Sequence, residues 1–478
     1  MKLPVKFKLI LAFACGLAGC AQLPARQPPE PMVVKPDMQK SLDTITDGPA
    51  FERTDWSSHT WWNTFNDKFL DRLVDSAMRD NPTLVSAQTR IEQAKQAKHL
   101  IELESGINYN SDGSAVRQHL SANGLFPPPL GGSTLNEGDI SVGVSYTFDW
   151  WGKNRALLQS ALGEKRAAEA ERGATELALA GEIADAYFSW QDITARLHLA
   201  AQIVEKRRAA LHLMESRLKR GIDSASATRQ TEGVLAQEQD NLKDLESQSQ
   251  ILRDRLAALT GNGPDWGAKL EEPALSPAHP FPLPQKLPLD WLARRPDLIA
   301  LKWQAEAAAN RIEVAKANFY PNVDIRLLLG LQSLDLSKWL GTKSDYASLG
   351  PAVHIPLFNG NSLRTTLGVR ESDYSRAVAQ YNQTLLTAAN QVADALVHVS
   401  SLEARERLQH DATLVSERSK HLQMERFGSG LTDRLPLLNE EIAALAQQSR
   451  ESKLQADRKR AMAALFMALG GGYESSQE

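Results

Sequence analysis

The stretch ISVGVSYTFDW, residues 140–150, places an apolar side chain at every even position and a small or polar one at every odd position. This alternation over about ten residues is typical of a transmembrane β-strand, with one face against lipid and the other toward a polar lumen. A half-buried strand of a soluble sheet is the alternative that the pattern leaves open. The alternation recurs in residues 323–331, broken only by Leu328, in residues 349–357 and, more weakly, in residues 107–117.

Four such strands are too few for a closed membrane sheet. The smallest single-chain barrels have about eight strands, and open sheet edges are not tolerated in lipid. We therefore expect several chains to contribute strands to one barrel. Each half of the chain supplies two strands, separated by loops that contain residues 124–129 and 339–341.

The N-terminus indicates export. An apolar stretch at residues 9–19 follows three lysines, Lys2, Lys6 and Lys8. This stretch is too short to span a bilayer, and residues 1–19 are interpreted as a secretory signal peptide. The signal ends in LAGC, residues 17–20, which resembles a bacterial lipobox. The resemblance implies a covalent lipid on Cys20, whereas a chance cysteine in an apolar segment, such as Cys15, is the alternative.

The residues after the lipobox bear on the compartment. Ala21 stands where an aspartate would resemble an inner-membrane retention signal, so outer-membrane sorting is favoured. This destination favours the membrane interpretation of the alternating segments over the soluble-sheet interpretation. Residues 20–50 are polar and rich in proline, which predicts an extended lipidated tether ahead of the first folded element.

Composition and motifs exclude several classes of protein. The 478 residues carry 54 Lys and Arg against 58 Asp and Glu, which excludes a basic nucleic-acid binder, and two cysteines predict no disulfide framework. No His-Glu-x-x-His pair occurs, and Gly152-Lys153 is followed by Asn154 and so is not a phosphate-binding loop. We therefore expect no enzyme and no cofactor apart from the covalent lipid, with energy supplied by a partner.

The distribution of proline predicts long helices. No proline occurs from Leu130 to Gly263 or from Leu357 to Leu435, and proline breaks helix interiors. Good helix formers fill Lys153–Lys219 and, after a break at 220–224, Ala225–Leu259. The first of these helices would be about 100 Å long, which is far more than a compact domain needs. Its narrow apolar stripe is typical of coiled-coil packing.

The chain repeats its own motifs. NPTL at residues 81–84 returns as RPDL at 295–298, and Leu259-Thr260-Gly261 returns as Leu469-Gly470-Gly471. Arg217-x-x-x-Gly221 returns 209 residues later as Arg426-x-x-x-Gly430. A period of this length indicates a duplicated half. We therefore expect a second helical hairpin at 361–427 and 433–469, and we divide the chain into repeats at 51–263 and 289–473, a proline-rich connector at 264–288 and a tail at 474–478.

In this order the motifs resemble outer-membrane efflux factors of the TolC type, in the lipidated NodT-like branch. Besides the lipobox and the repeated motifs, the resemblance rests on FYP at 319–321, FDWWGKNR at 148–155, IPLFNG at 355–360 and LGGGY at 469–473. It implies a mixed α/β fold with four strands per chain, and a homotrimer with a twelve-stranded outer-membrane barrel continuous with a periplasmic helical barrel. It also implies docking onto a periplasmic adaptor and an inner-membrane pump of the RND or major-facilitator type.

The resemblance also implies functional positions at the ends of the hairpins. Gly221 and Gly430 occupy the bends that contact the adaptor in the family, and Arg217 and Arg426 lie one turn earlier. Simple helix caps and solvated helix ends are the alternative interpretations. The pore constriction of the family maps onto two further positions, Leu435 and Asn439. The family often has aspartate at the second of these, so an acidic ring is in doubt here, although Glu440 and Glu441 follow directly.

The favoured function is a passive outer-membrane exit duct for drugs or other small toxic molecules. A type I protein-secretion duct of the same architecture is the first alternative. A non-conducting lipoprotein scaffold with periplasmic coiled coils is the second, and the amphipathic strands argue against it, because a scaffold would not need four strands of membrane length.

Overall fold

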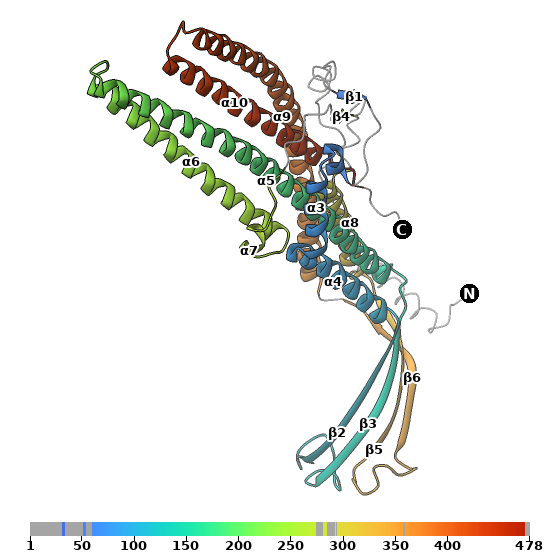
Figure 1. Ribbon diagram of the computed structural model, residues 1–478. Coiled ribbons are helices and arrows are strands. Elements are labelled where there is room, and N and C mark those ends of the chain that lie inside the picture. The colour runs from blue at the N-terminus through green and yellow to red at the C-terminus, as the bar shows by residue number, and fades with distance from the viewer. Residues whose placement is uncertain are drawn as a thin grey trace. The chain divides into compact units, whose positions relative to one another are not determined.

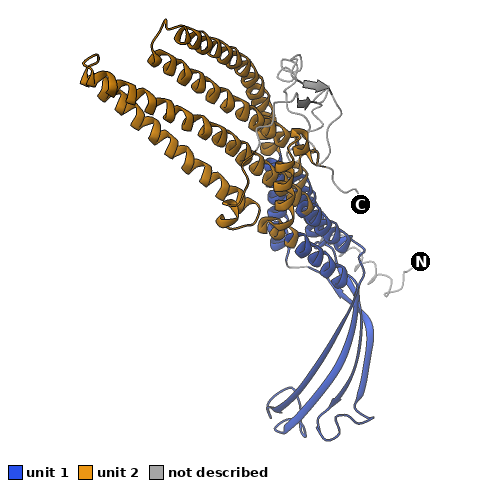
Figure 2. Ribbon diagram, in the orientation of Figure 1, with its two compact units in different colours: residues 1–32, 90–168, 301–381 blue, residues 33–89, 169–300, 382–478 orange. Residues whose placement is uncertain are grey.

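The computed structural model describes residues 31–33, 51–53, 60–273, 281–283, 292, 294–356 and 359–473. Cys20 and the expected signal peptide lie outside these residues, as does the expected tether except for 31–33. The described chain forms two compact units, built from residues 1–32, 90–168 and 301–381 and from residues 33–89, 169–300 and 382–478 (Figures 1 and 2). Among the described helices, none combines the length and the apolar character needed to cross a membrane.

The first unit contains one antiparallel sheet of four strands in the order β2-β3-β5-β6. The strands are β2 (Ile107–His119), β3 (Thr134–Thr147), β5 (Asn322–Ser333) and β6 (Asp345–His354). All four alternating segments therefore form strands, as predicted. β3 begins six residues before the predicted stretch and pairs with both β2 and β5, so the two repeats meet at its pairing with β5. Among the described residues, β2 and β6 are each paired along one edge only.

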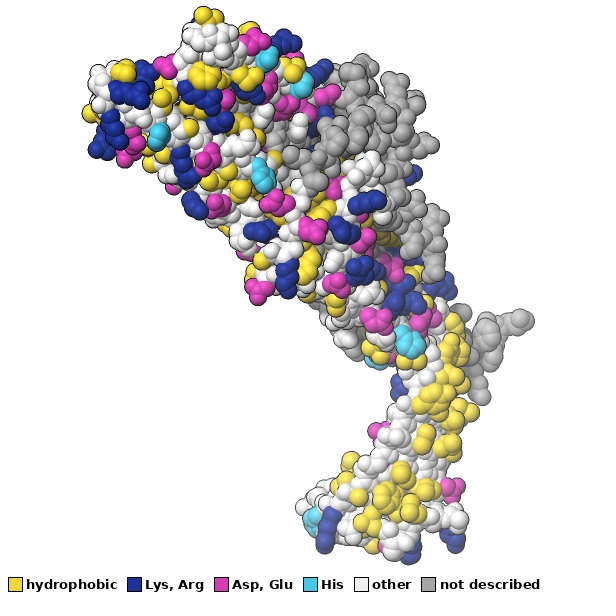
Figure 3. All heavy atoms as spheres, viewed as in Figure 1, with side chains coloured by type: hydrophobic (Ala, Val, Ile, Leu, Met, Phe, Trp, Pro, Cys, Tyr) yellow, Lys and Arg dark blue, Asp and Glu magenta, His cyan; other side chains and the backbone are white. Residues whose placement is uncertain are grey.

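The register gives the sheet two chemically different faces. Tyr146 lies opposite Ile325, whereas Thr147 lies opposite Asp324 and donates a hydrogen bond of 2.8 Å from its Oγ1 to the carboxylate. The same alternation runs along the sheet, and apolar side chains gather along one side of the strands in Figure 3. Ile140, Val142, Tyr146 and Phe148 are exposed on the apolar face, which is the arrangement predicted for lipid contact.

The last strand ends earlier than predicted. The alternating run extends to residue 357, which lies outside the described residues, but β6 stops at His354. Pro356 follows, and proline has no backbone N–H to donate to a strand ladder. Pro351 is tolerated inside β6 because this strand is at the edge of the sheet within the chain.

The helical segments of the first unit pack closely against one another. Ile312 and Ala315 on α8 (Pro296–Ala317) form a buried cluster with Phe319 and with Leu367 on α9 (Gly360–Gly428). A Cβ added at Gly163 on α5 (Lys153–Lys219) would lie 3.1 Å from the Ala307 side chain and 3.2 Å from a backbone oxygen of α8. Glycine at this position therefore permits close approach of the two helices.

The second unit contains the far parts of two long helical hairpins. The first joins α5 to α6 (Ala225–Leu259), and the second joins α9 to α10 (Arg434–Ala468). The two helices of the first hairpin have the predicted bounds, and those of the second differ from them by one residue at each end. The absence of proline and the abundance of helix formers delimited α5, α6 and α9, whereas α10, which contains Pro436 in its first turn, was predicted from the repeat.

Polar contacts join α5 to α10 in antiparallel order. Asp185 accepts from Arg460 at 2.7 Å, and Gln191 accepts from the buried Lys459 at 2.8 Å, while burial lowers the pKa of the Lys459 ammonium. Nearer to the bends, Lys206 forms an ion pair of 2.7 Å with Glu441. The two hairpins are thus tied together along their length within this unit.

An aromatic cluster fills the core of the second unit. Trp61, in the 3₁₀-helix η1 (Trp61–Phe65), stacks on Phe466 with ring centroids 5.5 Å apart. Phe69, on α3 (Lys68–Asp80), stacks on the fully buried Tyr187 at 5.6 Å. The Tyr187 hydroxyl donates to the Asp67 carboxylate at 2.8 Å, and the same carboxylate caps the N-terminus of α3. The buried hydroxyl therefore has an acceptor.

The side chains of the repeated Asn-Pro and Arg-Pro motifs donate hydrogen bonds to the C-terminal ends of the two hairpins. Asn81 precedes α4 (Pro82–Glu104) and donates from Nδ2 to the Leu259 carbonyl at the end of α6 at 2.8 Å. Arg295 precedes α8 and donates to the Ala468 carbonyl at the end of α10 at 3.0 Å. Proline at the first helical position removes no needed donor. Two different side chains thus satisfy equivalent helix C-termini.

The remaining elements are short. Helix α7 (Pro264–Gly267) follows α6, and β1 (Phe51–Arg53) pairs in parallel with β4 (Phe281–Leu283). Helix α7 and strand β4 lie in the proline-rich connector, and β1 lies at the start of the first repeat.

Candidate channel surfaces

Both hairpins end in the same backbone motif. Gly221 and Gly430 have φ values of +71° and +72°, in the left-handed region that favours glycine. In the first bend the amide of Ile222 donates to the Arg217 carbonyl at 2.9 Å. In the second bend the amide of Leu431 donates to the Arg426 carbonyl at 2.8 Å. These bonds are those of a Schellman motif, so the helix-cap interpretation of the two glycines is confirmed.

The helix that leaves each bend is capped by a side chain. Ser224 accepts from the Ala227 amide at 3.2 Å at the start of α6, and Asp433 accepts from the Arg434 amide at 3.1 Å at the start of α10. An oxygen at this position satisfies an amide that has no partner inside the helix. The bends are therefore defined on both sides and are not simple interruptions of a longer helix.

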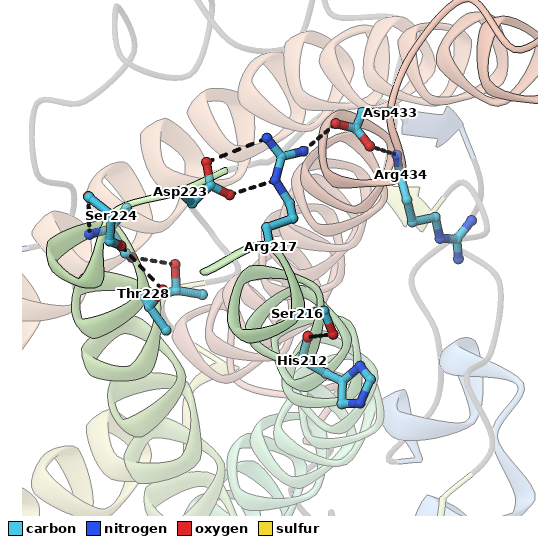
Figure 4. A network of polar contacts seen from close by, with 10 residues as sticks. His212, Ser216, Arg217, Asp223, Ser224, Thr228, Asp433 and Arg434 are labelled. Carbon is cyan, nitrogen blue, oxygen red and sulfur yellow. Dashed lines mark hydrogen bonds and ion pairs between the residues drawn. The ribbon is translucent and has the colours of Figure 1, made fainter. Parts of the chain in front are cut away.

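Arg217 connects the two bends (Figure 4). Its guanidinium donates from Nε to Asp223 Oδ2 at 2.5 Å, in its own bend, and from Nη1 to Asp433, in the other bend. The hydrogen bonds that Arg217 donates to Asp223 and to Asp433 raise the pKa of its guanidinium above the ordinary value, so the group is positively charged throughout the physiological range. The fork of N–H donors lets one side chain hold two carboxylates.

Arg426, the equivalent arginine of the second hairpin, is in a different environment. Its side chain is exposed, and within the described residues it has neither an ion pair nor a side-chain hydrogen bond. The position equivalent to Asp223 is Thr432, which accepts from Gln423 Nε2 at 3.1 Å. The two arginines were predicted as a matched pair, and the structure distinguishes them.

Leu435 and Asn439, the predicted constriction residues, lie one turn apart near the start of α10. Leu435 is half-buried and Asn439 is exposed. Their spacing of four places them on one face of the helix, while Leu437, Leu438 and Ile442 are buried on another. The two residues are therefore available on a common face for contact with other copies of the chain.

The two glutamates that follow do not supply the carboxylates of an acidic ring. Glu440 accepts from Ser419 Oγ on α9 at 2.9 Å, and Glu441 forms the ion pair with Lys206 on α5. Both carboxylates are thus used to fasten α10 to its neighbours. Neither of the predicted constriction residues, Leu435 and Asn439, carries a charge.

Aromatic side chains mark the end of the strands that adjoins α5. Tyr146 and Phe148 are in edge contact at 5.2 Å, and Phe148 stacks on the exposed Trp150 at 5.7 Å. Trp151 stacks on Tyr320 at 4.5 Å and donates from Nε1 to the Pro321 carbonyl at 2.8 Å. Amphipathic rings with one satisfied polar group are typical of the membrane–water interface.

The polar face of the sheet is less open than its small residues suggest. Ser141 is buried, and a Cβ at Gly143 would lie only 2.3 Å from the Asn110 side chain. Tyr346 covers Gly330 in the same way, and its hydroxyl donates to Asp139 at 3.1 Å. Larger polar side chains from β2 and β6 therefore form the surface that this face presents.

The sequence did not identify the apolar residues at the bends. Ile222 and Leu431, each directly after the bend glycine, are 60% and 72% exposed. They are equivalent positions, so the repeat itself could have identified them. Among the described residues, no group of three or more His, Cys, Asp and Glu side chains is placed to hold a metal ion.

Comparison with known proteins agrees with this geometry. The model of the family described as "Outer membrane efflux protein" matches residues 73–262 and 287–471. The chain is 29% identical to the multidrug resistance outer membrane protein MdtQ of Escherichia coli O6:H1 over 470 residues, covering 96% of each chain. It is 28% identical to MdtP of Escherichia coli K12, covering 98% of this chain and 96% of MdtP. The crystal structure of the outer membrane protein VceC from Vibrio cholerae is 31% identical, with a TM-score of 0.78 over 88% of this chain and all of VceC.

Proposed function

The chain belongs to the outer membrane efflux protein family, and on that premise we propose that three copies form the exit duct of a tripartite pump. The duct passes drugs or other small toxic molecules out of the periplasm, and the subunit is not an enzyme. The TolC-type fold and the outer-membrane location follow from the comparisons. The trimer, the partners and the lipid anchor are the parts that we propose.

The observation that carries the proposal is the open four-stranded sheet. Its apolar face is exposed, and β2 and β6 each have one edge that no other described strand pairs with. Unpaired strand edges are unstable in lipid, where no water can satisfy their amides and carbonyls. Pairing of β6 in one copy with β2 in the next satisfies both edges, and three copies give a closed barrel of twelve strands.

Helix α9 offers a second surface for assembly. Five of its exposed apolar residues recur at intervals of 11, 11, 7 and 7 residues, namely Leu386, Val397, Leu408, Val415 and Leu422. Intervals of 7 and 11 residues both return to the same side of a helix, and such stripes are typical of helices that pack on a partner helix. A neighbouring copy is the partner that the proposed trimer provides.

The two bends support docking of a periplasmic adaptor, which in turn joins the duct to an RND or major-facilitator pump. Ile222 and Leu431 present apolar side chains at equivalent places, beside Gly221 and Gly430. Exposed apolar residues at equivalent places in both bends favour a protein interaction site there. Arg426 is exposed nearby and free to pair with an acidic residue of the adaptor.

Cys20 carries the proposed lipid anchor, and the described residues do not include it. The lipid would hold the N-terminus at the membrane, but one anchor alone gives only limited membrane affinity. The strands therefore remain the main attachment. No other cofactor is proposed, and transport energy comes from the pump.

The test is to purify the full-length protein in detergent and examine it by electron microscopy and in planar bilayers. Hollow threefold particles that conduct ions are expected. Solid rods, isolated monomers or correctly inserted particles without conductance would eliminate the duct and favour a lipoprotein scaffold. Export of a protein substrate, with no export of small molecules, would favour the type I secretion duct.

Docking has its own test with a matched control. Ile222→Ser combined with Leu431→Ser should weaken capture of a periplasmic adaptor from the same organism. Leu125→Ser removes a leucine that is even more exposed, at 96%, from a strand loop and should leave capture unchanged. Equal loss in both variants would show that the bends are not the docking surface.

A further inference from the structure

A cavity of about 520 Å³ lies within the second unit, apart from the bends and from the strand sheet. Four helices contribute to it: α5, the first turn of α8 with the residue before it, α9 and α10. Its lining residues from α5 are Ala174, Leu177 and Ala178, those from α9 are Gln391, Asp394, Ala395 and His398, and those from α10 are Ala464, Met467 and Ala468. The volume falls in the range of pockets that hold drug-sized ligands.

The walls of this cavity are mainly apolar. Alanines from three helices, together with Leu177 and Met467, form most of the surface. Small side chains leave the space open, and methionine adapts its shape to different ligands. An apolar ring system of drug size would therefore replace water along most of the lining.

The polar groups of the lining favour a positively charged ligand over a negatively charged one. Arg295 is fully occupied, because it forms two hydrogen bonds with Asp297, at 3.1 and 2.8 Å, and also donates to Gln391 and to the Ala468 carbonyl. Its charge is thus neutralised by Asp297. Asp394 is exposed at the cavity and, among the described residues, has no ion pair or side-chain hydrogen bond. His398 lies one turn from Asp394 in the same lining, and an anion would meet the Asp394 carboxylate with no lysine or second arginine among the described lining residues to offset it.

From this combination of volume, apolar wall and unpaired carboxylate, we propose that the cavity binds a small amphipathic organic cation. The ring system of the ligand lies against the alanines and Met467, and its positive group pairs with Asp394. The existence of this site does not depend on conduction by the proposed duct.

Binding at this site has a structural consequence. The cavity is shared by α5 of the first hairpin and by α9 and α10 of the second. A ligand that binds the folded arrangement and not the unfolded chain stabilises the arrangement in proportion to its concentration. The ligand therefore fastens the bases of the two hairpins to each other.

The test uses the full-length protein in detergent and ethidium, a planar aromatic cation, with fluorescence anisotropy as the readout. Saturable binding of one ethidium per chain is expected. Asp394→Asn should weaken this binding by at least about tenfold, because a charge-assisted contact is lost. Asp411→Asn removes an exposed aspartate from the same helix outside the cavity and should leave the affinity unchanged.

A second pair of variants tests the volume of the site. Ala178→Trp fills the cavity from α5 and should abolish ethidium binding, whereas Ala404→Trp, on an exposed part of α9 outside the lining, should not. Phenanthridine, the neutral ring system, should lose affinity in Ala178→Trp but not in Asp394→Asn.

Three outcomes would overturn the proposal. One is ethidium binding that survives both Asp394→Asn and Ala178→Trp, which would place the dye elsewhere, for example in the passage. Another is an equal loss in the control variants. The third is no saturable binding by the wild-type assembly, which would mean that another copy or another segment fills the space. Size-exclusion profiles identical to wild type exclude misfolding as the cause of any loss.

Discussion

The two hairpin bends share one backbone and differ in their charges. Both have the Schellman hydrogen bonds, a left-handed glycine and an oxygen-bearing N-cap residue. Yet Arg217 holds two carboxylates, and Arg426 holds none within the described residues. The reason lies in two neighbouring positions: the first bend has Asp223-Ser224, where the second has Thr432-Asp433.

This difference shows which features of the bend are the same in both repeats and which features differ. The positive φ restricts the residue at the bend, because a side chain there is strained. The next positions need only one oxygen to cap the helix, and either serine or aspartate provides it. The placement of the acidic residues could therefore diverge, and it produced a contact from Arg217 in one hairpin to Asp433 in the other. One hairpin supplies the cation of this link and the other supplies a carboxylate.

The largest effect is expected at the predicted constriction, where the second hairpin has a leucine and the first has a serine at the equivalent position. Leu435 and Asn439 correspond to Ser226 and Gln230 in the first hairpin. Apolar rings can close a narrow pore by excluding water, so Leu435→Ser combined with Asn439→Ser should raise single-channel conductance in planar bilayers severalfold. Trimer stability should change little, since neither residue is fully buried.

The first hairpin provides the control for this prediction. Ser226→Ala combined with Gln230→Ala alters the equivalent positions, which are exposed, and should leave conductance as it is. Unchanged conductance in the Leu435 and Asn439 variant would place the constriction elsewhere in the assembly. Equal changes in both variants would show that the hairpins are not functionally distinct at this level.

A smaller effect is expected from the link between the hairpins. Arg217→Ala removes the hydrogen bonds to both Asp223 and Asp433. The arrangement in which the two bends are linked should therefore lose stability, and the fraction of time that the channel is open in recordings should rise. The change should be smaller than for the constriction variant, because the Lys206–Glu441 ion pair still joins α5 to α10. High salt should reduce the difference from wild type, since exposed ion pairs are screened.

Arg426→Ala is the matched control, because this arginine occupies the equivalent turn without a described partner. It should leave the open fraction unchanged in the absence of an adaptor. If Arg426→Ala opens the channel as much as Arg217→Ala does, the contact with Asp433 is not what holds the bends together.

The sequence predicted the parts of the molecule that depend on local signals. Long proline-free runs delimited α5 and α6 to the residue, because helix formers and breakers act locally. Alternation identified all four membrane-type strands for the same reason. The helices α3, α4 and α8 were not predicted, although Pro82 and Pro296 open two of them. Proline was read there as part of a repeated motif and not as the first residue of a helix.

Contacts between residues far apart in the chain could not be predicted. Arg217 and Asp433 are 216 residues apart, and no pattern in either segment indicates that they meet. The uses of Glu440 and Glu441 were likewise hidden, because pairing with Ser419 and Lys206 depends on how α10 is rotated against α9 and α5. The resemblance pointed to Leu435 and Asn439 as constriction positions, but it could not show what the neighbouring glutamates do.

The third prediction concerns the feature that the two bends share. Gly221→Ala and Gly430→Ala should each destabilise their bend by about 1–2 kcal/mol, the cost of a left-handed conformation for a residue with a Cβ. The space is not the cause, since a Cβ at either position would contact nothing within 4 Å. Hydrogen exchange at the Ile222 and Leu431 amides should accelerate by roughly tenfold.

Gly428→Ala tests the same substitution where the conformation is helical. Gly428 is the last residue of α9, has open space at its Cβ and has no positive φ. Alanine there should slow local exchange slightly, because it reduces the freedom of the unfolded chain. Faster exchange in this variant would show that side-chain bulk, and not φ, limits the bends.

The smallest effect is expected from giving the second bend the acid that it lacks. Thr432→Asp places a carboxylate where the first bend has Asp223, within the same spacing of six residues from the bend arginine. Arg426 then has a partner, and an exposed pair of this kind contributes about 0.2–1 kcal/mol. The new carboxylate can also accept the hydrogen bond that Thr432 now receives from Gln423, so nothing is left unsatisfied. The gain should appear as slower amide exchange at Leu431 and should vanish when Arg426→Ala is added, because only the pair distinguishes the variants. A gain that persists without Arg426 would come from helix N-terminal charge on α10, and the difference between the two arginines would then need another explanation.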